Sequence, residues 1–236
     1  MTEQEWLACD DPVAMWMFAR AKVSDRKGRL FACACCRQVW ELMTDPRSRA
    51  VVEFVERHAD AGPKGKRGFP ALRAGAWDAT EDAFDIKHGS THDRGQYYLA
   101  QAGEDAARAA ARMNVVVDVG LVRKYAADAA RWWRLSAHPD ARPAPAPELV
   151  EQAALLREIV GSGPVRPVPV DPRWLTTDVL ALARSIYEDR AFDRLPILAD
   201  ALEEAGCSDA DLLGHLRGPG PHVRGCWAVD LLLGKS

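Results

Sequence analysis

The sequence lacks any long apolar run, and no stretch of about 18 consecutive hydrophobic residues occurs in it. We therefore expect no transmembrane helix and no membrane partner. A strong net charge is missing as well, since 31 Lys and Arg face 34 Asp and Glu, which gives −3. This balance excludes a basic surface over the whole chain of the kind that binds nucleic acid. The first residues are acidic where a signal peptide needs positive charge, which predicts a cytoplasmic protein.

Motifs that carry catalytic chemistry are also missing. The chain has no Gly-x-Ser-x-Gly nucleophile elbow, no His-Glu-x-x-His motif and no complete Gly-x-x-x-x-Gly-Lys-Ser/Thr phosphate-binding loop. Asp82, Asp85, His88 and His92 form a local group of acids and histidines near a predicted loop. Loops carry such residues routinely, so this group does not by itself indicate acid–base chemistry or a metal. The sequence favours a protein that is not an enzyme.

The six cysteines do not have the spacing of a secreted disulfide scaffold. A reducing compartment would keep the cysteines as thiols. Cys33, Cys35 and Cys36 form a cluster in a predicted helix, where small packing residues are one interpretation. A soft-metal or oxidant-sensing site is the other, either alone or together with His58 or Cys9.

Helix signals, in contrast, run through almost the whole chain. Thr2 and Glu5 have the spacing of a capping box, and Asp stands directly before Pro at residues 11–12 and again at 45–46. These signals and the spacing of the apolar residues predict four helices in the first 60 residues. Further helices are expected over residues 71–85, 96–113, 121–135, 148–160, 178–189, 195–205 and 222–233, with a short one after Ser208.

Proline divides this helical pattern. Residues 138–147 contain four prolines, which favour an extended spacer over a helix. We predict an N-terminal helical region over residues 1–135, a proline-rich spacer over 136–147 and a C-terminal helical module over 148–236. The predicted fold class is all-α, an irregular multi-helix bundle or array of short helices with proline-rich connectors.

The densest group of reactive side chains lies near the C-terminal end. Cys207, His215, His222 and Cys226 fall within 20 residues, around the turn Gly218-Pro-Gly-Pro221. Zinc takes four Cys or His ligands in a tetrahedron, so these residues are candidate zinc ligands. His222 and Cys226 would share one face of a helix. The spacing matches no standard zinc finger, so core thiols and hydrogen-bonded histidines stay open as the alternative.

Two segments resemble a family of uncharacterised bacterial proteins. The first is Glu5-Trp-Leu-Ala-Cys-Asp-Asp-Pro12 with Leu30-Phe-Ala-Cys-Ala-Cys-Cys-Arg37. The second begins at Arg190-Ala-Phe-Asp-Arg-Leu-Pro-Ile-Leu-Ala-Asp-Ala-Leu-Glu-Glu-Ala-Gly-Cys207 and ends in Asp230-Leu-Leu-Leu-Gly-Lys235. The resemblance implies no activity. Members of the family often have a cysteine where this chain has Leu216, which removes one candidate ligand.

The predicted function follows from these features. We expect a non-enzymatic scaffold or adaptor-like protein whose helical surface binds another protein. The alternative is a zinc-binding or thiol-dependent protein centred on the C-terminal Cys/His cluster. Nucleic acid is not favoured as a partner, because a solvent-exposed surface accounts for the basic residues Lys64, Lys66, Arg67 and Arg73.

Overall fold

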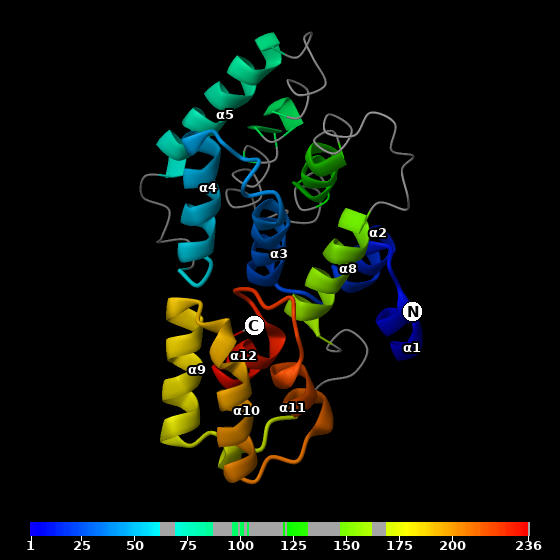
Figure 1. The fold of residues 1–236 in the computed structure, drawn as a ribbon, viewed down its shortest axis with the longest axis vertical. Coiled ribbons are helices and arrows are strands. Elements are labelled where there is room, and N and C mark those ends of the chain that lie inside the picture. The colour runs from blue at the N-terminus through cyan, green and yellow to red at the C-terminus, as the bar shows by residue number, and fades with distance from the viewer. Residues whose placement is uncertain are drawn as a thin grey trace. The chain divides into compact units, whose positions relative to one another are not determined.

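The computed structural model describes residues 1–61, 69–86, 96–98, 100–101, 103, 120, 122–131, 147–161 and 169–235 (Figure 1). This part of the chain consists of α-helices, short 3-10 helices and connecting turns, without a strand. The prediction of an all-α array of short helices is therefore confirmed. None of these helices is both long and apolar enough to cross a membrane.

The chain divides into two compact units. One is formed by Asp10–Ala153, and the other combines Met1–Cys9 with Ala154–Ser236. The division falls inside helix α8 (Pro147–Val160). Of the predicted spacer over 136–147, all but Pro147 lies outside the described residues, as do the basic side chains of the loop before Phe69.

The unit Asp10–Ala153 contains α2 (Pro12–Ala19), α3 (Asp25–Gln38), α4 (Pro46–Arg57) and α5 (Phe69–Ile86). Asp11 and Asp45 cap α2 and α4 with their carboxylates, and Pro occupies the first turn of both helices, as predicted. α4 packs against both α3 and α5. The apolar face of α3 is buried, and its Phe31 stacks on Trp16 of α2 with 5.9 Å between ring centroids.

The second unit begins with α1 (Glu3–Ala8), which the predicted capping box of Thr2 and Glu5 starts. Its other helices are the end of α8, η2 (Pro172–Trp174), α9 (Thr177–Asp189), η3 (Phe192–Arg194), α10 (Leu195–Glu204), α11 (Ala210–Arg217) and α12 (Trp227–Leu232). α10 contacts both α9 and α11, and α12 contacts α9 and α11 (Figure 1). Leucines of α10 and α11 pack with Ile186 and Val229 in one hydrophobic core.

The last helix is shorter than predicted, which changes the setting of two candidate ligands. The expected helix was 222–233, whereas α12 covers only Trp227–Leu232. Gly225 has φ +98°, a left-handed conformation that an α-helix does not contain, and Cys226 follows it as the N-cap of α12. His222 and Cys226 therefore do not share a helix face. A turn brings them together instead.

Candidate metal site

Four side chains with ligand-type atoms converge in the unit that contains the C-terminal helices. They are Glu158, His215, His222 and Cys226, and one ligand atom of each lies within 4.8 Å of the corresponding atoms of the other three. Glu158 is in the last turn of α8 and His215 in the last turn of α11. His222 directly follows the Gly218-Pro-Gly-Pro221 turn, and Cys226 directly precedes α12. Distant segments thus supply the four groups.

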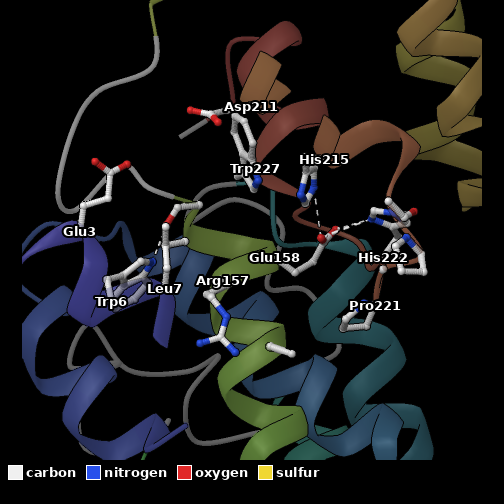
Figure 2. A pocket seen from close by; sticks show the side chains of 15 residues that line it. Glu3, Trp6, Leu7, Arg157, Glu158, Asp211, His215, Pro221, His222 and Trp227 are labelled. Carbon is white, nitrogen blue, oxygen red and sulfur yellow. Dashed lines mark hydrogen bonds and ion pairs between the residues drawn. The ribbon is translucent and has the colours of Figure 1, made fainter. Parts of the chain in front are cut away.

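The Glu158 carboxylate stands between the two histidines (Figure 2). Its Oε2 atom lies 3.2 Å from Nε2 of His215 and 3.3 Å from Nδ1 of His222. The backbone N–H of Val223 also donates to Oε1, over 3.4 Å. Only 3 % of the Glu158 side chain is exposed, so these neighbours replace almost all of its hydration.

This setting shifts two pKa values in opposite directions. Burial raises the pKa of Glu158, but the hydrogen bonds and the charges of His215 and His222 outweigh it and keep that pKa below its ordinary value. Burial lowers the pKa of His222, but the bond to Glu158 and its negative charge outweigh burial and raise that pKa. Glu158 is therefore held as a carboxylate, and the proton on His222 is held more tightly than usual.

Both histidines are oriented by neighbouring groups. His222 donates from Nε2 to the carbonyl of Gly218 over 3.0 Å, which directs its Nδ1 atom toward Glu158. His215 lies against the indole of Trp227, with 4.9 Å between ring centroids. These contacts limit rotation of the two rings.

The wall behind the site is close-packed at the end of α8. Gly161 follows the helix with φ +64°, a conformation that favours glycine. A Cβ atom at this position would lie 2.7 Å from the indole of Trp227, so any side chain there would collide with the ring. The Gly161 carbonyl accepts a hydrogen bond of 3.0 Å from Nε1 of Trp6, which is fully buried. The first helix of the chain is thus tied to the segment that carries Glu158.

Three of the four residues predicted from the sequence belong to this group, namely His215, His222 and Cys226. Cys207 does not. It follows Gly206 at the end of α10, where its N–H donates to the carbonyl of Leu202 and its side chain is part of the hydrophobic core. Burial raises the pKa of the Cys207 thiol.

Sequence reasoning missed Glu158, which takes the fourth position. A signal for it was present, because this acid lies within a helix segment whose neighbours Leu155, Leu156 and Ile159 are apolar. All three neighbours are buried, and so is Glu158. A carboxylate on an apolar helix face needs a partner. The sequence alone does not reveal that this partner is a pair of histidines more than 50 residues away.

The other candidate groups have ordinary structural contacts where the structure describes them. Burial raises the pKa of Cys33 and raises that of Cys35 to about 12. The imidazole of His58 bonds the carbonyl of Phe54 over 2.8 Å, and Asp82 pairs with Arg47. His88, His92 and the side chain of Asp85 lie outside the described residues. No second group of three or more potential ligands converges in the described part of the chain.

A nucleophilic Cys-His-Glu arrangement does not fit the geometry. In a catalytic triad one ring nitrogen of the histidine faces the nucleophile and the other faces the acid. Here Nε2 of His215 is 3.3 Å from the Cys226 sulfur and also 3.2 Å from Glu158. Burial and the negative charge of Glu158 raise the pKa of Cys226 well above its ordinary value, which is the opposite of thiol activation.

Comparisons with models of protein families, with curated proteins and with solved structures found no match.

Proposed function

We propose that this protein binds one zinc ion through Glu158, His215, His222 and Cys226. The convergence of a carboxylate oxygen, two imidazole nitrogens and a sulfur within 4.8 Å carries the proposal. Two nitrogens with one sulfur and one oxygen suit zinc, which accepts all three donor types in tetrahedral sites. A site made only of hard oxygen ligands would instead suit magnesium or calcium.

The distances between the ligand atoms support a tetrahedral ion. Bonds of about 2.0–2.3 Å at tetrahedral angles place neighbouring ligand atoms about 3.3–3.8 Å apart. The pairs that meet at Glu158 and at Cys226 are separated by 3.2–3.3 Å. The other pairs of ligand atoms lie within 4.8 Å, so small movements of the four side chains would admit the ion at the centre.

The hydrogen bond that orients His222 supports the same function. Histidines that bind a metal usually donate their other N–H to a carbonyl or a carboxylate. His222 does so through Gly218, which leaves Nδ1 to face the Glu158 carboxylate. A neutral His222 in this tautomer would place a lone pair against an anion. Either a proton on Nδ1 or a cation between the two groups relieves this repulsion.

The test compares two buried cysteines of the same unit. The full chain is purified without chelator or affinity metal, and its zinc content is measured. We expect about one zinc per chain for the wild type and for Cys207→Ser, and almost none for Cys226→Ser. If Cys207→Ser also loses zinc, the ligand set proposed here is wrong. If the wild type neither contains zinc nor takes it up in dialysis, the proposed zinc-binding function is wrong.

Zinc affinity should fall steeply as the pH decreases. Binding needs a neutral His222 and a thiolate at Cys226, whose pKa values are both raised in the metal-free protein. Below these pKa values zinc has to displace both protons, so its dissociation constant should rise up to about a hundredfold per pH unit. Glu158 adds no proton in this range because its pKa is lowered. Competition with a chromophoric chelator between about pH 6 and about pH 8 measures the slope, and a flat profile would contradict the ligand assignment.

A cytoplasmic location and a protein partner stay predictions from the sequence. The zinc proposal favours the metal-binding alternative over the thiol-dependent one, because the buried Cys226 has a raised pKa. It is compatible with a scaffold role, since a metal ion held by four protein ligands stabilises a fold.

A further inference from the structure

A pocket of about 370 Å³ opens beside the proposed zinc site (Figure 2). Its volume is in the range of pockets that bind small molecules. Glu158, His215 and His222 line it, so three of the four proposed ligands border the cavity. Cys226 does not line it and is 1 % exposed. A bound metal would therefore have one side toward the pocket.

The remaining walls of the pocket are mostly apolar. Trp6 and Leu7 of α1 line one side, and Trp227 lies near His215, while Pro219 and Pro221 of the Gly-Pro turn form another edge. Figure 2 shows Trp6 and Leu7 across the cavity from His222 and Pro221. Such walls suit a compact apolar body, aromatic or aliphatic, in contact with indole and proline rings.

The charged side chains of the pocket limit the polar group that such an apolar ligand can carry. Glu3 and Asp211 line the pocket with Arg157, whose guanidinium donates to the carbonyl of Cys9 over 2.6 Å. Glu158 and the Cys226 thiolate balance the two positive charges of a bound zinc ion. Glu3 and Asp211 then outnumber Arg157 by one negative charge, which disfavours a molecule that arrives as an anion. The head group should arrive neutral and bind the metal through a donor that suits a site already containing a cysteine sulfur. A thiol meets both conditions.

We infer that the pocket binds a small apolar thiol whose sulfur coordinates the metal in place of Glu158. This inference rests on the proposed zinc function. When the thiol binds, its S–H bond breaks, a sulfur–zinc bond forms and the zinc–oxygen bond to Glu158 breaks. The proton passes to the released Glu158 carboxylate, because the positive charges of His215 and His222 that lower its pKa in the metal-free protein are lost when both rings bind the metal as neutral ligands. One anionic ligand replaces another and the total charge of the site stays constant, which suits a buried position.

The test uses the full chain loaded with Co(II), which replaces zinc and makes the ligand sphere visible in the absorption spectrum. Benzyl mercaptan is the probe, and benzyl alcohol is its oxygen analogue. The matched variants are Leu7→Trp, which fills the pocket, and Ile197→Trp, which lies outside its lining. Leu7 and Ile197 are 58 % and 57 % exposed, so both variants should fold.

The Cys226 sulfur already gives a sulfur-to-cobalt absorption band, and we expect benzyl mercaptan to increase this absorption in a saturable way, whereas benzyl alcohol should not. Leu7→Trp should bind the mercaptan at least about tenfold more weakly with unchanged cobalt content, and Ile197→Trp should match the wild type. Cobalt uptake without a response to the mercaptan would overturn this inference and leave the metal site intact. If Leu7→Trp binds the mercaptan as tightly as the wild type, the mercaptan does not bind in this pocket and the inference is wrong. A wild type that takes up no cobalt or zinc would overturn both proposals.

Discussion

Glu158→Gln is expected to abolish zinc binding and to destabilise the unit that contains it. The substitution keeps the size of the side chain but removes the anion that faces His215 and His222. Loss of one partner from a buried charged group costs about 3–5 kcal/mol of unfolding free energy. Zinc should raise the denaturation midpoint of the wild type, whereas the variant should not respond to it.

Glu151→Gln is the matched control for this prediction. It makes the same chemical change on the same helix, but at an exposed position where the carboxylate accepts a hydrogen bond from Gln38. Its effect on stability should be within about 0.5 kcal/mol, and its zinc content should equal that of the wild type. Urea unfolding with and without zinc measures both variants. If Glu158→Gln binds zinc normally, Glu158 is only a hydrogen-bond partner of the two histidines.

The helices could be predicted because their starting signals are local. The carboxylates of Asp11 and Asp45, each followed by Pro, cap α2 and α4 as their sequence pattern indicates. Where two candidate cap residues stand side by side the pattern was less decisive. The helix expected over 178–189 is capped by Thr176 and begins at Thr177, and the helix expected after Ser208 is capped by Asp209. Side chains one position apart compete for the same backbone N–H groups, and packing decides between them.

The candidate metal site was predictable only in part, because its geometry depends on turns and on a helix that is distant in the sequence. His215, His222 and Cys226 are close in sequence, and residue type alone identified them as candidate ligands. Cys207 has the same chemistry, but the turn at Gly206 directs it into the hydrophobic core. The fourth group, Glu158, meets the histidines only after folding.

The packing of the first nine residues could not be predicted for a similar reason. Nothing in their composition indicates that they belong with Ala154–Ser236, yet Trp6 is fully buried in that unit. The capping box determines where α1 starts, but it does not determine which segment α1 packs against. The hydrogen bond from Trp6 to Gly161 identifies this neighbour, and it depends on a contact across 155 positions of the sequence.

Trp6→Ala should therefore destabilise the unit that combines Met1–Cys9 with Ala154–Ser236, although Trp6 is far in the sequence from the helices of that unit. Truncation of a buried tryptophan costs about 3–5 kcal/mol of unfolding free energy, through lost apolar contacts and the cavity that remains. The Gly161 carbonyl also loses its indole donor. Because Gly161 packs on Trp227, which contacts His215, zinc should dissociate faster from this variant.

Two further variants separate the causes. Trp6→Phe keeps most of the ring volume but removes the N–H donor, so it should cost about 1–3 kcal/mol, mainly from the unsatisfied carbonyl. Leu7→Ala changes the exposed neighbour and should cost less than about 0.5 kcal/mol. Urea unfolding and zinc release to a chelator measure all three variants. Equal stability of Trp6→Ala and Leu7→Ala would show that the first helix does not support the unit. A destabilised Trp6→Ala with unchanged zinc release would instead show that α1 stabilises the unit without holding the metal site in place.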